Sequence, residues 1–211
     1  MKNSRKKKCF MKSEIELQVN GERNFKHIKT ALIDFDGTLL DSTNCWIEAY
    51  CLLCEKLEVT PIGHIMERFG KISFAEWKSF IFKQLGECEE TLLACAKEVY
   101  GKRKPKETVL KMIRLLPNTC CKIIITKEPE VLVLHWLEQH GRNEFSRVIT
   151  VHEERKEEAY YEYPSLLLID DNYEHCMAAK KANAVVIGVN DHHTDERKIQ
   201  MQMICDLYLE N

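Results

Sequence analysis

Residues 29–42 read KTALIDFDGTLLDS, an apolar run that ends in two carboxylates, Asp34 and Asp36, followed at once by Gly37 and Thr38. A short apolar run with polar boundaries is typical of a buried strand. Burying a carboxylate in a core costs free energy, so a strand that ends in two of them is expected to present them for chemistry. The stretch therefore predicts a strand with a functional site at its carboxyl end.

Short apolar runs rich in Val, Ile and Leu recur along the chain, with helical patterns between them. This alternation predicts a parallel sheet of βαβ units, that is, a Rossmann-like α/β core. Besides the strand at 29–34, strands are expected at residues 121–126, 147–151, 165–170 and 184–189, and an edge strand at 206–210.

An insertion separates the first two strands, because residues 35–120 far exceed the dozen or so residues that a parallel crossover needs. Helices are expected in this interval at residues 42–58, with Ser42 as the N-cap, and at 73–85, 88–100 and 106–116. We therefore predict a helical cap over 42–103, an α/β core formed by 26–41 and 104–211, and a basic, flexible tail over 1–25.

The composition is that of a globular protein with one sizeable core, since 45% of the 211 residues are hydrophobic and 30% are charged. A net charge of -2 predicts no general attraction to nucleic acid. Residues 1–12 hold six basic residues and no acid. We interpret them as a solvated tail, with a nuclear address or a phosphate-binding patch as the alternatives.

Two further features bear on location. No apolar stretch reaches the ~18 residues of a membrane span, and the N-terminal residues lack the apolar core of a signal peptide. The ten cysteines show no disulfide framework, and Cys51 and Cys54 form the single C-x-x-C, without the second pair that a zinc site needs. We expect reduced thiols in a cytoplasmic protein that binds no membrane, with the nucleus as the alternative location.

Ligands of an open parallel sheet bind at the carboxyl ends of its strands. The side chains expected there are acidic or polar: Asp34 and Asp36, Thr126 and Lys127, residues 152–156, and Asp170 and Asp171. Several carboxylates so close together repel one another, and a bound cation is the usual remedy. Oxygen ligands favour Mg²⁺, which takes one or two carboxylates together with a substrate phosphate.

The segment DFDGTLLDS, from Asp34 to Ser42, resembles the first motif of the haloacid dehalogenase superfamily, and the insertion after it resembles the helical cap of one branch. IIIT, ending at Thr126, resembles the second motif, and LLLIDD, ending at Asp170 and Asp171, resembles the fourth in its paired-acid form. Residues 125–150 are similar to the corresponding region of phosphoglycolate-type phosphatases. The resemblance covers residues 29 to about 190.

The resemblance implies a role for each motif residue. Asp34 would be the nucleophile that forms an aspartyl-phosphate, and Asp36 would protonate the leaving oxygen and then activate water. The family's dehalogenases lack this second carboxylate, so Asp36 favours phosphoryl transfer. The remaining implied roles are phosphate contacts by Gly37, Thr38, Thr126 and Lys127, charge neutralisation by Lys156, and Mg²⁺ ligation by Asp34, the Asp36 backbone carbonyl, Asp171 and Asp170.

The chain departs from the family pattern at two motifs. Family members commonly carry another acid four residues after the first acid of the fourth motif. Counting from Asp171 gives His175 and counting from Asp170 gives Glu174, so which acid binds metal stays open. Lys156 lies in the charged run HEERKEE, with Arg155 and Lys127 as alternatives for its role.

We therefore predict a Mg²⁺-dependent phosphatase for a small phosphorylated metabolite, with Arg68, Lys71 and Trp77 as candidate cap contacts. One alternative is phosphonate, pyrophosphate or mutase chemistry, although Trp46 stands where the sugar phosphomutases of this branch have a His. The other alternative, motivated by the altered fourth motif and the basic tail, is a catalytically weak protein that binds a phosphorylated ligand or a partner. No motif names the substrate or the oligomeric state.

Overall fold

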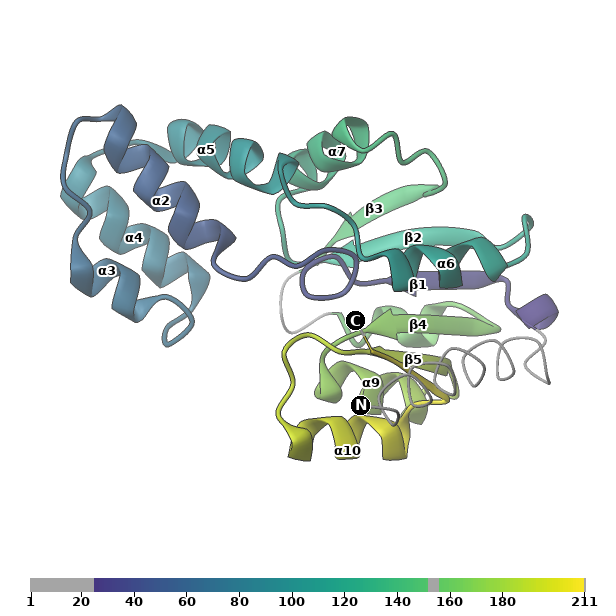
Figure 1. Ribbon diagram of the computed structural model, residues 1–211. Coiled ribbons are helices and arrows are strands. Elements are labelled where there is room, and N and C mark those ends of the chain that lie inside the picture. Colours follow the sequence, from purple (N-terminus) through teal and green to yellow (C-terminus); the bar gives the residue numbers. More distant parts are fainter. Residues whose placement is uncertain (1–24, 152–155, 211) are drawn as a thin grey trace, which may run out of the picture.

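The computed structural model describes residues 25–151 and 156–210. The predicted tail, apart from Phe25, and the alternative residue Arg155 lie outside these residues. Six strands form one parallel sheet in the order β3-β2-β1-β4-β5-β6 (Figure 1). They are β1 (Thr30–Ile33), β2 (Cys121–Thr126), β3 (Arg147–Thr150), β4 (Leu166–Asp170), β5 (Val185–Val189) and β6 (Leu207–Leu209). The predicted Rossmann-like α/β fold is confirmed, including the edge strand.

Helices cover both faces of the sheet. Ala31 and Ile33 of β1 pack in the same apolar cluster as α6 (Glu107–Leu115) and α7 (Glu130–Gln139). Leu32, between them, points to the opposite face, where it packs with α8 (Ala159–Glu162), α9 (Tyr173–Lys181) and α10 (Asp195–Ile204). Because both faces are buried, the strands read as continuous apolar runs rather than as alternating patterns.

The strand register brings the predicted site residues to one edge of the sheet. Ile33 pairs with Ile124 of β2 and with Ile169 of β4, and the Asp34 backbone N–H donates to the Ile169 carbonyl at 2.9 Å. The chain leaves β3 on one side of β1 and re-enters the sheet at β4 on the other side. The carboxyl end of β1 therefore lies at the point where the strand order reverses, which is where such sheets bind ligands.

Four helices stand apart from the sheet, at the left of Figure 1. They are α2 (Cys45–Lys56), α3 (Gly63–Arg68), α4 (Phe74–Leu85) and α5 (Glu89–Gly101), and together they fall within the interval predicted to form the cap. Trp77 is fully buried among them and donates from Nε1 to the Ile65 carbonyl at 2.8 Å. Helix α5 packs against α2 and also against α7, which joins this helical group to the core.

The start of each cap helix depends on its local chemistry. Helix α4 begins after Ser73, whose hydroxyl accepts from the Glu76 N–H while the Glu76 carboxylate accepts from the Ser73 N–H, a capping box. Ser42 as the N-cap of α2 is wrong: the cap is Asn44, in the left-handed region at φ 62° and without a side-chain bond. The Ser42 side chain hydrogen-bonds the Asp36 carboxyl instead. Helix α3, only six residues long, was not predicted.

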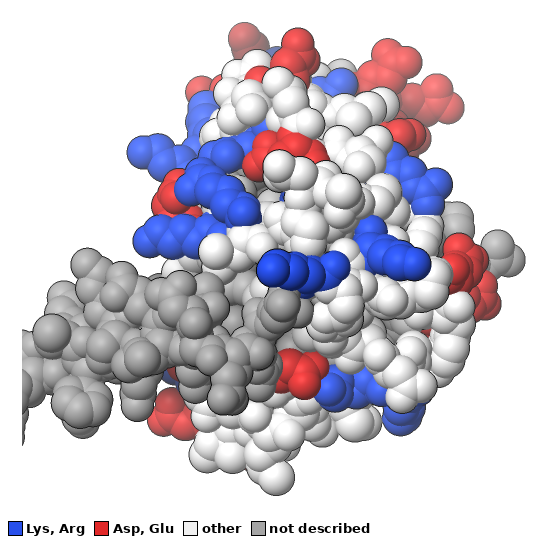
Figure 2. Space-filling view, turned by 90° about the vertical axis from the view of Figure 1, so that its right-hand side faces the viewer, with Lys and Arg blue, Asp and Glu red and all other residues white. Residues whose placement is uncertain are grey.

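Several general properties can be checked on the described residues. No helix within 25–151 and 156–210 is long and apolar enough to cross a membrane. The cysteines of these residues are free thiols, most of them buried. Figure 2 shows one face of the molecule, on which basic and acidic side chains are interspersed among uncharged ones.

Candidate active site

A cavity of about 390 Å³ opens between the carboxyl ends of β1, β2 and β4 and the helical group α2–α5. All four predicted catalytic residues line it: Asp34, Asp36, Thr126 and Lys156. The other lining residues on which the argument depends are Trp46, Phe69, Tyr100, Lys127, Glu128, Asp171, His175 and Asp191. The structure thus brings together residues that are as far apart in the sequence as Asp34 and Asp191.

Lys156 is the centre of a buried ion network. Its ammonium lies 2.6 Å from Oδ1 of Asp34 and 2.9 Å from Oδ2 of Asp170, and the side chain is only 2% exposed. Burial alone lowers the pKa of Lys156, but Asp170 and Asp34 outweigh it and raise that pKa. A permanently charged lysine therefore holds the predicted nucleophile in place. This geometry favours Lys156 over Lys127, which is exposed at the cavity rim.

Both carboxylate oxygens of Asp170 already have partners within the protein. Besides Lys156, Oδ1 accepts from the Asn172 N–H at 2.8 Å, and the His175 ring nitrogen Nδ1 lies 3.2 Å from Oδ2. Burial raises the pKa of Asp170, but Lys156 and His175 outweigh burial and lower it to about 2. Asp170 is therefore anionic and positions Lys156.

Asp171 has fewer partners. The Thr38 hydroxyl donates to its Oδ1 at 2.8 Å. Burial raises the pKa of Asp171 well above its ordinary value, and the charges of Asp34 and Asp170 add to this. Gly37 lies beside it at φ +70°, and a Cβ there would come within 2.7 Å of Oδ2 of both Asp171 and Asp191. Glycine is therefore required here by backbone conformation and by space. Thr38 is buried against Asp171 and does not line the cavity.

Three carboxylates could share one cation. Oxygens of Asp34, Asp170 and Asp171 all lie within 4.8 Å of one another. An all-oxygen set suits Mg²⁺. The positive charge of such an ion would offset the burial and the carboxylate repulsion that raise the pKa values of Asp34 and Asp171. The residues present therefore fit a magnesium ion. Asp36 differs from them, because its carboxyl interacts with the cap.

The Asp36 side chain faces two aromatic residues and another acid. The Tyr100 hydroxyl donates to Oδ1 of Asp36 at 3.1 Å and lies 3.5 Å from Oε1 of Glu128. The Trp46 indole N–H donates to both Glu128 oxygens, at 3.0 and 3.1 Å. Burial, followed by the charges of Glu128 and Asp34, raises the pKa of Asp36 well above its ordinary value. This environment favours the protonated carboxyl, which is the form that a general acid needs.

Thr126 is buried at the end of β2, and its hydroxyl oxygen accepts from the Glu128 N–H at 3.1 Å. The hydroxyl hydrogen remains to donate into the cavity. The three candidate cap contacts are not among the residues that line this cavity: Trp77 is in the cap core, Arg68 stacks on Phe80, and Lys71 is exposed.

Sequence reasoning missed several residues of the cavity, of which Asp191, Glu128 and Tyr100 matter most to its chemistry. Asp191 follows β5 at the same sheet edge, and the strand-end rule applied to the predicted strand 184–189 would have identified it. Glu128 is two residues past β2, so the same rule taken slightly further would have found it. Tyr100 carried no signal, because its position depends on how α5 packs against α2 and α7.

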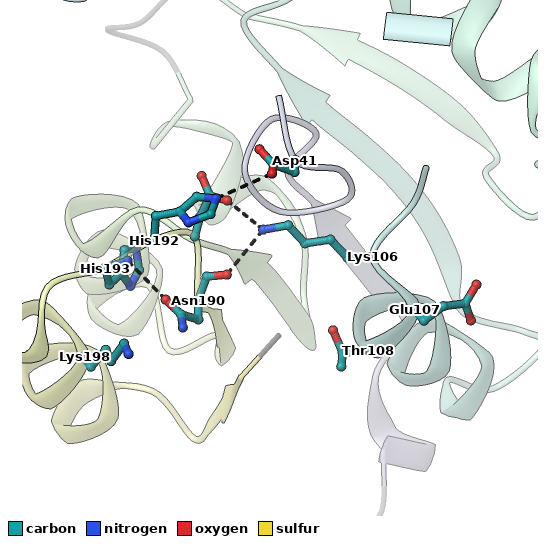
Figure 3. Close-up of a pocket in the computed structure, with 9 residues that line it drawn as sticks. Asp41, Lys106, Glu107, Thr108, Asn190, His192, His193 and Lys198 are labelled. Atoms are coloured by element: carbon teal, nitrogen blue, oxygen red, sulfur yellow. Dashed lines mark hydrogen bonds and ion pairs between the residues drawn. The ribbon is translucent and has the colours of Figure 1, made fainter. Parts of the chain in front are cut away.

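A second cavity, of about 660 Å³, lies where both chain segments that lead to the cap meet the loop after β5 (Figure 3). Here the Lys106 ammonium lies 2.8 Å from Oδ1 of Asp191 and also contacts the Gly37 carbonyl, and His192 lies 3.5 Å from Asp41. Lys106 thus ties the returning segment to the loop that carries the predicted nucleophile.

No protein-family model matches the chain, and no curated protein matches its sequence. Solved structures do match its fold. A candidate β-phosphoglucomutase of Thermotoga maritima superposes with a TM-score of 0.67 at 16% identity, over 87% of this chain and 94% of that one. A candidate hydrolase of the haloacid dehalogenase type from Bacillus subtilis, bound to magnesium, gives 0.61 at 15% identity, over 86% and 94%.

A haloacid dehalogenase-like hydrolase from Streptococcus pneumoniae gives a TM-score of 0.59 at 13% identity, over 88% of this chain and 94% of that one. Identities this low establish the fold and leave the activity to be argued from the site. The resemblance seen in the motif around Asp34 is thus confirmed at the level of the fold: the chain has the fold of the haloacid dehalogenase-type hydrolases, with four helices inserted after the first strand.

Proposed function

We propose that the chain is a Mg²⁺-dependent phosphatase that hydrolyses a small phosphomonoester through an aspartyl-phosphate on Asp34. The observation that carries the proposal is the pairing of two different carboxyls in one cavity. Asp34 is held by the Lys156 ammonium, whereas Asp36 lies against Tyr100 and Glu128 in surroundings that favour its protonated form. One acid is equipped to attack and the other to donate a proton.

In the first step, a carboxylate oxygen of Asp34 forms a bond to phosphorus and the bond from phosphorus to the ester oxygen breaks. Lys156 fixes the attacking group at 2.6 Å and opposes the burial that raises its pKa. Asp36 gives its proton to the leaving oxygen, so that the product departs as a neutral alcohol rather than as an alkoxide.

In the second step, water attacks the phosphorus of the aspartyl-phosphate. Asp36, now ionised, takes the proton from that water, phosphate leaves, and the Asp34 carboxylate is restored. The Thr126 hydroxyl and the Lys156 ammonium line the same cavity and donate to phosphoryl oxygens. A magnesium ion held by Asp34 and Asp171, with Asp170 behind them, would supply further positive charge at those oxygens.

The experiment is phosphate release from a panel of small phosphomonoesters, with and without Mg²⁺, by the wild type, Asp34→Asn and Asp41→Asn. Asp41 is the matched control, because it lies in the same loop but is exposed and does not line this cavity. Release that requires Mg²⁺, disappears in Asp34→Asn and persists in Asp41→Asn is expected. Release that survives Asp34→Asn, or that is the same without Mg²⁺, would overturn the proposal.

A further inference from the structure

Glu128 is a carboxylate that makes or breaks no bond in the proposed catalytic cycle, although its charge helps to keep Asp36 protonated. It lines the cavity and is half-buried. Its described side-chain partners are the Trp46 indole, the Asp36 carboxyl and, at 3.5 Å, the Tyr100 hydroxyl. Within residues 25–151 and 156–210, no lysine, arginine or histidine is paired with it. A carboxylate placed in this way attracts a cation.

Its hydrogen-bonding capacity is only partly used. A carboxylate has about four lone-pair sites. The single Tyr100 hydroxyl hydrogen is directed to Asp36, at 3.1 Å, rather than to Glu128. The side-chain donors to Glu128 are then the indole N–H of Trp46, shared between its two oxygens, and the protonated Asp36 carboxyl. Glu128 can therefore accept further hydrogen bonds from a group inside the cavity.

The walls beside Glu128 are aromatic. Trp46 from α2, Phe69 just after α3 and Tyr100 from α5 line the same cavity. Aromatic rings attract cations, and organic ammonium groups in particular, because they bind without needing a full shell of water. A carboxylate with aromatic neighbours is an environment that suits an alkylammonium group better than a neutral or an anionic one.

The position of Glu128 determines which part of a bound phosphate ester it would contact. The phosphoryl group belongs at Asp34, the ester oxygen at Asp36, and Glu128 lies beyond Asp36, connected to it through Tyr100. The part of the alcohol next to the ester oxygen therefore faces Glu128. Lys127, the other charged group of this segment, is exposed at the rim, where solvent screens its charge more strongly.

Building on the function proposed above, we infer that the substrate is a phosphorylated amino alcohol, in which Glu128 and the rings of Trp46, Phe69 and Tyr100 bind a positively charged amine or quaternary ammonium group close to the ester oxygen. The cavity, of about 390 Å³, suits a small molecule of this kind. Glu128 is a specificity residue and takes no part in bond making or breaking.

The experiment compares pairs of esters of the same shape that differ only in charge, and it adds one smaller, anionic ester. Choline phosphate is paired with its uncharged isostere, in which a quaternary carbon replaces the nitrogen, and phosphoglycolate serves as the anionic counterpart. Each is measured with the wild type, Glu128→Gln and the control Glu130→Gln, which changes an exposed acid in the first turn of α7. Aminoethyl phosphate and propyl phosphate form a second pair without the bulk of the methyl groups.

In the wild type, kcat/KM for the cationic ester should exceed that for its isostere by about tenfold or more, because hydrogen bonds and contacts to charged groups are stronger than those to neutral ones. Tenfold corresponds to about 1.4 kcal/mol. Glu128→Gln should bring that ratio close to one. It should also lower the rate with the neutral isostere, because the Glu128 charge helps to keep Asp36 protonated, so the ratio and not the absolute rate is the readout. Glu130→Gln should leave the ratio unchanged. Equal rates for both esters, an equal loss for both in Glu128→Gln, or a preference for phosphoglycolate would overturn the inference.

Binding to Asp34→Asn, followed by calorimetry, separates this inference from the proposed function. If no ester is hydrolysed but this variant binds choline phosphate more tightly than its isostere, and an added Glu128→Gln change removes the difference, the proposed phosphatase fails and the cation subsite stands. If all esters are hydrolysed through Asp34 with no preference for the cationic one, the phosphatase stands and the cation subsite is rejected.

Discussion

Replacing Lys156 by methionine should lower the free energy of unfolding more than almost any other lysine substitution. The side chain is 2% exposed, and its ammonium is the cation shared by Asp34, at 2.6 Å, and Asp170, at 2.9 Å. Methionine fills a similar volume, so the main change is electrostatic: two buried carboxylates lose their common partner. Breaking a buried pair in this way costs about 3–5 kcal/mol.

The loss should be visible in thermal unfolding as a fall in Tm of about 6–20 °C for a chain of this size. Its pH dependence has a definite sign. Burial raises the pKa of Asp170, but Lys156 outweighs it and the pKa falls to about 2, below the usual 3.8. The wild-type pair therefore stabilises the fold above pH 3.8, and this stabilisation is lost as the pH falls toward 2. The difference in Tm between Lys156→Met and the wild type should therefore become smaller as the pH falls from 3.8 toward 2.

Lys102→Met is the matched control, because the Lys102 ammonium lies 3.1 Å from Glu98 on the surface, with the lysine side chain 72% exposed. Removing this pair should cost at most about 1 kcal/mol. In the Lys156→Met background, Asp170→Asn should recover part of the lost stability by removing an uncompensated charge. If Lys156→Met were no more destabilising than Lys102→Met, the buried ion network described here would be refuted.

Three further predictions concern the metal site and the cap. Gly37→Ala should lower the free energy of unfolding by about 1–2 kcal/mol because of the φ of +70° alone. Because the new Cβ would crowd Asp171, the Mg²⁺ concentration that gives half-maximal activity should also rise. An unchanged midpoint would count against this metal site. Burial and mutual repulsion raise the pKa values of Asp34 and Asp171, so the Tm of the metal-free protein should fall as pH rises above 3.8. Mg²⁺ should oppose that fall, because at a hundredfold excess over Kd it raises the free energy of unfolding by about 2.7 kcal/mol. Equal Tm values with and without Mg²⁺ at pH 7 would contradict this. Trp77→Ala should cost about 3–5 kcal/mol in denaturant unfolding, since the indole is fully buried in the cap; a loss below 1 kcal/mol would mean that the cap core is not packed as described.

The core of the fold was predictable because its signals are local. Each strand is buried on both faces and reads as an apolar run, and in a parallel sheet the residues that follow such runs meet at one edge. This is why Asp34, Thr126 and Asp170 could be placed together from the sequence. The short helix α3 gave no comparable signal. Ser42 looked like a helix cap because its hydroxyl suits that role, but the site takes that hydroxyl for Asp36.

The cap side of the site was not predictable in the same way. Tyr100 meets Asp36 only because α5 packs against α7, a contact between distant segments that no local pattern records. Glu128 was overlooked because an acid near a helix start is common on protein surfaces. Its proximity to Trp46 and Tyr100 appears only in three dimensions.

The measurement that tests the central claim most directly is mass spectrometry of Asp36→Asn after reaction with p-nitrophenyl phosphate in the presence of Mg²⁺. This ester has a leaving group that needs no protonation, so the first step should proceed, whereas the second should slow because no base activates water. A phosphoryl group should accumulate on the peptide that contains Asp34, and hydroxylamine should remove it. A phosphoryl group found on another residue, or a burst of free phosphate with no modified protein at any time, would contradict the mechanism.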